Sequence, residues 1–587
     1  MPQGKPYAGT IRKLVLGIDI GTTYSGVSYC ILTPGEVPKV LSVTRFPGQE
    51  GENRLRDTKI PSILYYDGRG NVRAVGAEAL VDDNTIMAEQ EGWTLAEWFK
   101  LRLQPDGPQA NGSSLARVLA HKSIINIYAD YLTYLFRCAK VFISDQPIGR
   151  QVLESEANID FVLSHPNGWG GDQQRQMRLA VIKAGLIPDT PDGHARVHFV
   201  TEGEASLHFC IANGLTEDVL EVDNHIMIVD AGGGTVDLST YKVLRSSSVN
   251  VVESSAPDCL LHGSKFVNDR ARVFLQETLE GSRFGKDDDI NEMVKYFESN
   301  TKPTFRDPGK VSYIKFGGRD STDVPHGIKK GVLSLPGVDI ERLFEPSVTA
   351  IKGAIRAQAR LATGRISRIL LVGGFANSPY LRSRLQDFAE SEGIPLFCPN
   401  SQTSKAAAEG SLWYHLDRSV SARIAKYTFG TSGCINFIPF LPDHMKRMEK
   451  AFVGIDGDVS LPNAFAPIVS RGTLVTEDQE FRVSMSHNSS SPDSRITLRI
   501  MSYKGAQERP RWVDEDTENF STHCLVHAEL GSKSYEQRVG MRGEYYTKEY
   551  KAVILFGLTE MKALISWESD GQEHRSPATL VFEGADA

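Results

Sequence analysis

GIDIGTT at residues 17–23 and IVDAGGGTVD at residues 228–237 decide the fold of this 587-residue chain. Each segment is an apolar strand that ends in Asp and continues through a turn of Gly and Thr into a second apolar run. Backbone N–H groups in such a turn can bind phosphate oxygens, because Gly places no Cβ in the way. Two such copies predict two similar lobes that face each other across a nucleotide cleft.

A third segment, ILLVGGFAN at residues 369–377, is an apolar strand followed by Gly-Gly. Such a turn would let an adenosine lie against the backbone. An isolated Gly-Gly is more often an ordinary turn. It is the order and spacing of the three segments that favour a nucleotide site.

The three segments resemble the phosphate-1, phosphate-2 and adenosine motifs of the actin-like ATPase fold, which actin, sugar kinases and the 70-kDa heat-shock (DnaK-like) chaperones share. The chaperone version is the most similar, and the resemblance matches a divergent, member-12-like branch. It extends from about residue 13 to about residue 416 and implies a two-lobed actin-like ATPase (ribonuclease H-like) fold of the α/β class. Four shorter segments also resemble chaperone motifs: IPSIL at 60–64, HP with DQQRQ within 165–176, TEGEA at 201–205 and LHGSKF at 261–266.

The composition excludes several classes of protein. A net charge of −8 argues against general nucleic-acid binding, and no apolar run approaches the ~20 residues needed to span a membrane. The first ten residues lack the apolar centre of a signal peptide. The seven cysteines include no Cys-x-x-Cys pair, which is typical of reduced thiols. We therefore expect a cytoplasmic protein.

The chain is expected to contain a disordered lead-in, a two-lobed nucleotide-binding domain and a β-rich C-terminal domain. After about residue 420, short strand-like runs alternate with loops rich in Ser, Pro, Asp and Gly. The chaperones' linker and helical lid are not recognisable there, so ordinary peptide clamping is left open. The expected limits are 1–12 for the lead-in, 13–420 for the nucleotide-binding domain (lobes at about 13–210 and 225–400) and 421–587 for the C-terminal domain.

Local patterns predict a hairpin and three helices. Strand formers flank turn residues within 64–72, and apolar residues recur at helical spacing in three longer windows. The windows are 115–140, 172–184 and 341–362.

Asp19 and Asp230 end the two facing strands and are expected to hold Mg²⁺ through its waters, since Mg²⁺ keeps several waters and takes one or two carboxylates. The alternative is that each Asp caps its own turn. The resemblance implies that the phosphates of ATP or ADP contact Gly21, Thr22, Thr23, Tyr24, Gly232, Gly233, Gly234 and Thr235.

The resemblance also places two catalytic residues. Glu202 matches the carboxylate that orients or deprotonates the attacking water. Gly203 stands where the family has Pro, and a surface Glu beside Glu204 is the alternative. Lys100 resembles the family's lysine that reaches the γ-phosphate, where it would neutralise developing charge. A surface Lys beside an apolar cluster is its alternative.

Around the adenosine, Gly373, Gly374 and Asn377 match by position, although the family usually has Arg where Asn377 stands. Glu298 is expected to reach the ribose hydroxyls, and an exposed helical Glu is its alternative. Pro166 matches the proline that relays the nucleotide state in the family.

The sequence therefore predicts an ATP-binding, weakly ATP-hydrolysing, chaperone-like protein that couples its nucleotide state to a protein partner. ATP or ADP and Mg²⁺ are the expected cofactors. One alternative is a nucleotide-sensing scaffold with negligible hydrolysis, and another is a small-molecule kinase of the same fold. The sequence specifies neither the client nor the oligomeric state.

Overall fold

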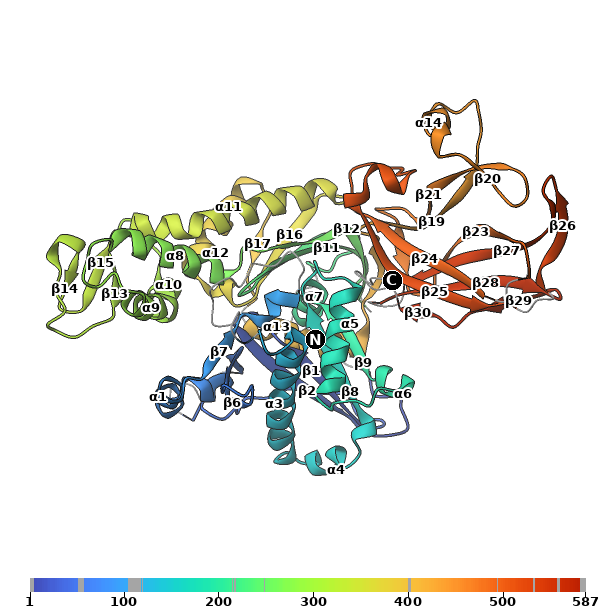
Figure 1. Ribbon diagram of the computed structural model, residues 1–587. Coiled ribbons are helices and arrows are strands. Elements are labelled where there is room, and N and C mark those ends of the chain that lie inside the picture. Colours follow the sequence, from blue (N-terminus) through green and yellow to red (C-terminus); the bar gives the residue numbers. More distant parts are fainter. Residues whose placement is uncertain are drawn as a thin grey trace. The chain divides into compact units, whose positions relative to one another are not determined.

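The chain forms two compact units. The first contains residues 1–168 and 176–420, and the second contains residues 169–175 and 421–587. The computed structural model (Figure 1) describes residues 5–50, 58–103, 118, 120–213, 215, 218–246, 249–399, 403–492, 495–530, 534–556 and 560–580.

The first sheet of the first unit carries the first phosphate turn. In spatial order it contains β3 (Val40–Ser42), β2 (Tyr24–Leu32), β1 (Lys13–Asp19), β8 (Ile159–His165) and β9 (Val197–Thr201), with β4 (Lys59–Pro61) beside β2. β1 and β2 form the hairpin of the turn, and β1, β8 and β9 are parallel. Helices cover both faces, which explains why these strands are almost continuously apolar. Phe136 of α3 (Ile124–Ser144) packs on Phe161 of β8 on one face, and α13 (Ala406–Asp417) covers the other.

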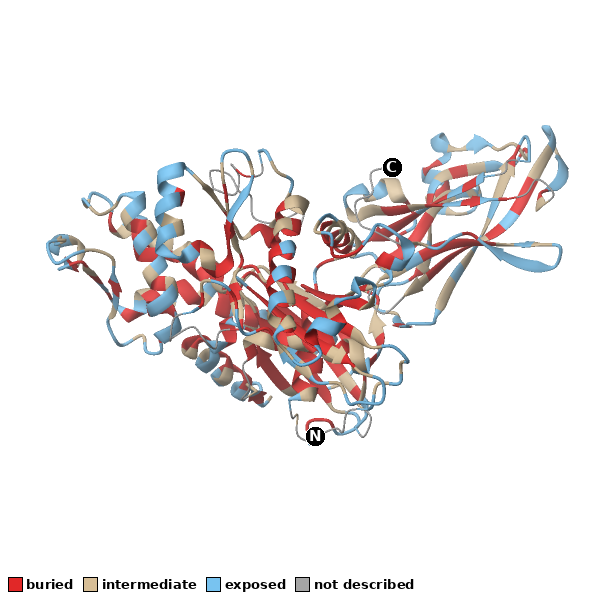
Figure 2. Ribbon diagram, turned by 90° about the horizontal axis from the view of Figure 1, so that it is seen from below, coloured by how far each residue is buried: buried red, intermediate tan, exposed pale blue. Residues whose placement is uncertain are grey.

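The second sheet repeats this plan. Its strands in the first unit are β17 (Leu396–Phe397), β16 (Ile366–Val372), β10 (His225–Ala231), β11 (Val236–Arg245) and β12 (Asn250–Leu260). β10 and β11 form the hairpin of the second phosphate turn, and β16 is parallel to β10. Buried residues follow these central strands (Figure 2). The predicted two-lobed α/β fold is therefore confirmed.

The helices of the second lobe share one hydrophobic core with one face of its sheet. They are α8 (Ser264–Thr278), α9 (Asp287–Tyr296), α11 (Gly337–Leu361) and α12 (Pro379–Ser391). The opposite face is covered by α7 (Glu202–Ala212). Smaller elements of the first unit are β5 (Ile63–Tyr66), β6 (Val72–Val75), β7 (Thr94–Glu97), α1 (Asp82–Glu91), α4 (Gly149–Leu153), α6 (Pro191–His194), α10 (Lys302–Thr304), β13 (Ser312–Lys315), β14 (Ile328–Lys329) and β15 (Val332–Leu335).

The predicted hairpin and helices are present with shifted limits. β5 and β6 form the hairpin expected at 64–72. α5 (Gly171–Lys183) and α11 lie where helices were expected. α3 begins at Ile124, because the Ser123 side chain accepts the backbone N–H of Asn126 and caps the helix. The expected start near 115 falls in 104–117, which lies outside the described residues.

Two helices cross between the lobes. α7 follows β9 of the first sheet but packs on β10 and β11 of the second, whereas α13 follows the second sheet but packs on β1, β2 and β8 of the first. Where the helices meet, a Cβ on Gly410 would lie 1.9 Å from the carbonyl oxygen of Ala205. A Cβ on Gly17 would likewise lie 2.5 Å from the carbonyl oxygen of Ala408. α13 thus completes the first lobe, which the expected lobe limit of about residue 210 did not include.

The second unit is a β-rich fold of two sheets, as predicted. One contains β20 (Phe452–Val453), β21 (Val459–Val469), β19 (Thr428–Asn436), β24 (Arg495–Tyr503) and β25 (Phe520–Glu529). The other contains β23 (Glu480–Ser489), β27 (Gly543–Phe556), β28 (Met561–Ser569) and β29 (Gln572–Arg575), with β26 (Glu536–Gly540) and β30 (Thr579–Leu580) at its sides. Leu498, Val526, Ala552 and Ile565 belong to the core that the two sheets share. β18 (Val420–Ile424) pairs with β22 (Leu474–Thr476), and α14 (Pro442–Lys446) follows β19.

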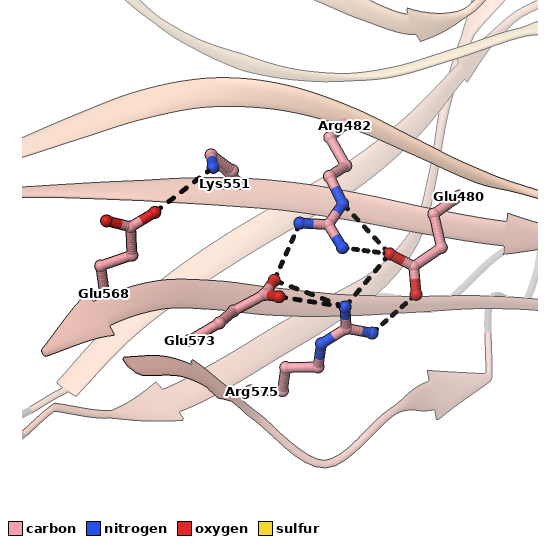
Figure 3. A network of polar contacts seen from close by, with 6 residues as sticks. All are labelled: Glu480, Arg482, Lys551, Glu568, Glu573 and Arg575. Atoms are coloured by element: carbon pink, nitrogen blue, oxygen red, sulfur yellow. Dashed lines mark hydrogen bonds and ion pairs between the residues drawn. The ribbon is translucent and has the colours of Figure 1, made fainter. Parts of the chain in front are cut away.

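A network of charges covers part of the second sheet of this unit (Figure 3). Arg482 binds Glu480 and Glu573, the latter at 2.8 Å, and Arg575 binds Glu480 at 2.6 Å. These side chains are partly exposed, so single pairs contribute little to stability. The network shows that this surface is charged.

The structure also bears on the N-terminal lead-in and on membrane-spanning helices. Within the predicted lead-in of residues 1–12, Tyr7 is paired: its backbone N–H donates to the carbonyl of Glu36, and its carbonyl accepts the N–H of Gly35. Among the described helices, none combines the length and apolar character that crossing a membrane requires.

The helix crossing gives the first prediction. Gly410→Ala is expected to lower the free energy of unfolding by about 1–3 kcal/mol, because the added Cβ overpacks the contact with Ala205. The matched control is Gly353→Ala within α11, where a Cβ would meet nothing within 4 Å. That control is expected to stabilise the chain by up to about 1 kcal/mol through helix propensity. Urea denaturation of the full chain measures both, and equal stability of the two variants would contradict the prediction.

Candidate active site

A cavity of about 340 Å³ lies between the two phosphate turns. This size suits a small-molecule site. The cavity brings together nearly all of the predicted site residues: Asp19, Gly21, Thr22, Thr23, Tyr24, Lys100, Glu202, Asp230, Gly232, Gly233, Gly234, Thr235, Gly373, Gly374 and Asn377.

Strand ends and helix starts create this cavity. β1 of the first sheet and β10 and β16 of the second sheet all end at it. β10 and β16 are parallel, so their carboxyl ends lie at the same edge of their sheet. α7 begins there at Glu202, capped by Thr201, whose Oγ1 accepts the N–H of Glu204 at 3.2 Å. α13 begins there near Ala407. The partial positive charge of two helix N-termini therefore favours an anion in this position.

The glycines allow the two turns to touch. A Cβ on Gly233 would lie 2.2 Å from Thr23 Oγ1, and one on Gly234 would lie 2.3 Å from Thr22 Oγ1. Gly373 has φ of +94°, and a Cβ on it would lie 2.4 Å from Asp230 Oδ1. Any side chain at these positions would push the turns apart or displace the carboxylate.

Two ion pairs line the cavity, one part-buried and one buried. Lys59 Nζ lies 2.7 Å from Asp19 Oδ2, and Lys100 Nζ lies 2.5 Å from Glu202 Oε1. Burial works to raise the pKa of Asp19, but Lys59 and Lys100 outweigh it, so the pKa is lowered. Burial likewise works to lower the pKa of Lys100, but Glu202 and Asp19 raise it. Lys100 and Glu202 are 3% and 8% exposed. The alternative interpretation, in which each is an ordinary surface residue, is therefore wrong.

Asp230 differs from Asp19, because no lysine among the described residues forms an ion pair with it. Burial and the nearby Glu202 raise its pKa to about 7, and a hydrogen bond from Ser206 Oγ at 2.5 Å offsets only part of this. A buried carboxylate without a cation is stabilised by a divalent ion. The donor set of Asp19 and Asp230 with Thr hydroxyls nearby therefore fits hydrated Mg²⁺, and the two lysines and the Gly turns fit phosphate.

One predicted residue lies elsewhere. Glu298 does not line the cavity; its side chain is 42% exposed and lies 4.0 Å from Lys302 Nζ. Glu298 belongs to a π-helical turn, Phe297–Thr301, which rotates the residues around it relative to a regular α-helix. The structure thus does not bring Glu298 to the cavity wall. Glu298 is an exposed helical residue, which was the alternative to a ribose contact.

The sequence reasoning did not identify four residues of the cavity wall: Lys59, Thr403, Ser404 and Ala407. Lys59 directly precedes the IPSIL segment, which was the one local signal available. The others follow residues 400–402, which lie outside the described residues.

Trp98 was also missed. It has φ of +55°, which is strained for a bulky residue, and it stands two residues before Lys100. Lys265 of α8, in the other lobe, places its Nζ 4.1 Å from the Trp98 ring centre. This cation–π contact across the lobes helps to hold the strained backbone that delivers Lys100 to the cavity.

Asn167 joins three segments near the cavity and was likewise missed. Its backbone N–H donates to Asp237 Oδ1 at 2.6 Å, and its side-chain amide donates to Leu238 O and Ser239 Oγ, both at 3.0 Å. Its Oδ1 accepts the N–H of Gly203 at 3.2 Å. Asn167 directly follows Pro166. It therefore connects the end of β8 to the start of α7 and to the second lobe.

The packing around residue 203 explains why this position holds glycine. A Cβ on Gly203 would lie 2.2 Å from Ser239 Oγ and 3.0 Å from the Asn167 side chain. The position at which the family has Pro is therefore closed to any side chain in this chain, because Asn167 and Ser239 fill the space.

Asn167→Ala is expected to lower the free energy of unfolding by about 1–3 kcal/mol, because buried backbone groups at Gly203 and Leu238 lose their partner. Asn224→Ala is the control, since Asn224 bonds the carbonyls of Asp218 and Val219 near the surface. Its effect is expected to stay within about 0.5 kcal/mol. Equal losses in urea denaturation would argue against a joining role for Asn167.

The comparisons with known proteins agree with this geometry. The chain is 22% identical to heat shock 70 kDa protein 12A of Mus musculus over 631 residues, which covers 94% of this chain and 89% of that protein. It is 25% identical to a chaperone protein HscA homolog of Azotobacter vinelandii (68% of this chain, 57% of that protein). It is 24% identical to a mitochondrial-type heat shock protein 70 of Encephalitozoon hellem (70% and 64%). No protein-family model matches the chain. These similarities support a divergent 70-kDa heat-shock family protein of the 12A-like branch.

Proposed function

We propose that the cavity binds Mg²⁺ and ATP or ADP, hydrolyses ATP slowly, and couples the bound nucleotide to a protein partner in the cytoplasm. The observation that carries the proposal is the meeting of two phosphate turns with Asp19, Asp230, Glu202 and two lysines in one cavity. The similarity to heat-shock 70-kDa proteins supports a chaperone-like ATPase in general.

Asp19 and Asp230 would hold Mg²⁺ through its waters, and the ion would supply charge neutralisation at the phosphates when bound. Lys59 holds Asp19 in place through its 2.7 Å ion pair. The N–H groups of the two Gly turns and the hydroxyls of Thr22, Thr23 and Thr235 would donate to phosphate oxygens.

Glu202 would orient the attacking water and accept its proton, while the bond from the γ-phosphorus to the bridging oxygen breaks and ADP and phosphate form. Its ion pair with Lys100 limits this work, because Glu202 Oε1 is already bonded to Lys100 Nζ at 2.5 Å. Lys100 would instead neutralise charge on the transferring group. We therefore expect slow turnover.

The helix crossing would transmit the nucleotide state. α7 starts at Glu202 and α13 starts beside the cavity, so a change in either turn would move helices that each cover the other lobe's sheet. The β-rich C-terminal unit would then bind the protein partner.

A nucleotide-sensing scaffold with negligible hydrolysis is the second candidate. The direct Lys100–Glu202 pair favours it, since the carboxylate that would accept the water's proton is already bonded to Lys100 through Oε1. Both candidates require Mg-nucleotide binding and differ in phosphate release.

Asp230→Asn tests the metal role. Single-turnover release of labelled phosphate from Mg-ATP is expected to fall roughly 100-fold or more, because charge stabilisation at the phosphates is lost. Asp307→Asn, an exposed carboxylate outside the cavity, is the control and should release phosphate like wild type. Binding without release in wild type would favour the scaffold, and no nucleotide binding at all would overturn both candidates.

Glu202→Gln tests the proton acceptor. The amide keeps the shape and the contact to Lys100 but cannot take a proton, so the single-turnover rate is expected to fall roughly 100-fold. Nucleotide affinity, measured by calorimetry, should change little. Glu280→Gln, an exposed residue after α8, is the matched control. An unchanged rate in Glu202→Gln would remove Glu202 from the mechanism.

A further inference from the structure

A cluster of Asp160, His198 and His415 lies at the first sheet, at the ends of its strands opposite to the nucleotide cavity. Asp160 stands near the start of β8, His198 near the start of β9 and His415 near the end of α13. Asp19, by contrast, stands at the end of β1 and lines the nucleotide cavity. The cluster is therefore separate from the site already described.

The strand register places the cluster on the face that α13 covers. Asp160 pairs with Val15, and Val162 pairs with both Gly17 and His198. Gly17 contacts α13, as its close approach to Ala408 shows. Because alternate residues of a strand share a face, Asp160 and His198 both point toward α13 and toward His415.

The three side chains converge. One ligand atom from each lies within 4.8 Å of the corresponding atoms of the other two, and the two imidazole rings are 4.9 Å apart. Asp160 is buried and both histidines are half-buried.

We propose that Asp160, His198 and His415 bind one divalent transition-metal ion of the zinc type. Two imidazoles and one carboxylate are the donor set that Zn²⁺, Co²⁺ and Ni²⁺ prefer, whereas Mg²⁺ and Ca²⁺ prefer oxygen ligands alone. Three protein ligands leave a fourth position for water.

Lys13 is the built-in competitor for this site. Its Nζ lies 3.0 Å from Asp160 Oδ2, and its side chain is 32% exposed, so it can turn to solvent when an ion enters. A positive charge so close repels a divalent cation. Removing Lys13 should therefore strengthen binding, which distinguishes a metal site from a merely structural His–Asp contact.

An ion here would fix α13. The helix runs from Ala407 at the nucleotide cavity to His415 at the cluster, and the ion would join its far end to β8 and β9. The site does not depend on the proposed function, because none of its ligands lines the nucleotide cavity.

Calorimetric titration of the metal-free full chain with Zn²⁺ tests the proposal. Wild type is expected to take up one equivalent that is lost in His415→Ala and His198→Ala, through a fall in affinity of at least roughly 100-fold. The control is His194→Ala, which removes a surface histidine that pairs with Asp189 at 2.8 Å and should leave uptake unchanged. Circular dichroism checks that each variant is folded.

Lys13→Met supplies a gain that misfolding cannot imitate. Zn²⁺ is expected to bind this variant roughly tenfold more tightly, because a like charge beside the ion is removed. Visible absorption of Co²⁺ at the site should show nitrogen and oxygen ligands and should disappear in His415→Ala. Uptake that persists in both histidine variants, or an unchanged affinity in Lys13→Met, would overturn the site.

Discussion

The crossing of α7 and α13 is the constraint on which the first unit depends. Each helix is attached to one lobe by sequence and packs on the sheet of the other, and the two meet where Gly410 lies against the Ala205 carbonyl. A close helix contact of this kind has little freedom to adjust, because packed interiors resist added volume. The N-termini of both helices reach the same cavity, so the crossing fixes the position of Glu202 relative to both phosphate turns.

Charge balance within the cavity follows from that placement. Asp19 and Glu202 each pair with a lysine, whereas Asp230 accepts a hydrogen bond from the Ser206 hydroxyl and has a pKa raised to about 7. Of the three carboxylates that line the cavity, Asp230 is therefore the one whose negative charge is most costly to bury. The site is therefore best matched to a ligand that brings both cation and anion, as a magnesium–phosphate complex does.

The strand–turn segments could be predicted because their information is local. The runs that end at Asp19, Asp230 and Gly373 each combine an apolar strand with a Gly turn, and the two-lobed fold follows from their repetition. Lys59, Asn167 and Trp98 carry no local pattern, because their roles arise from partners distant in sequence. Glu298 was placed by resemblance alone, and a π-helical turn that no sequence pattern announces surrounds it. The packing of α13 on the first lobe is likewise a tertiary contact, and limits assigned to each lobe along the sequence cannot predict it.

The same helix explains why two different chemistries can share one sheet. The phosphate turns and strand-end carboxylates lie at the carboxyl ends of the parallel strands. At the amino ends of the strands, side chains from the C-terminal end of the covering helix α13 lie against the sheet. His415 is one of these side chains, and Asp160 and His198 lie opposite it on the same face. A rise of about 1.5 Å per residue places His415 roughly 12 Å along the axis from Ala407. An ion bound at one end would thus restrain the helix that forms the cavity wall at the other, without touching the nucleotide.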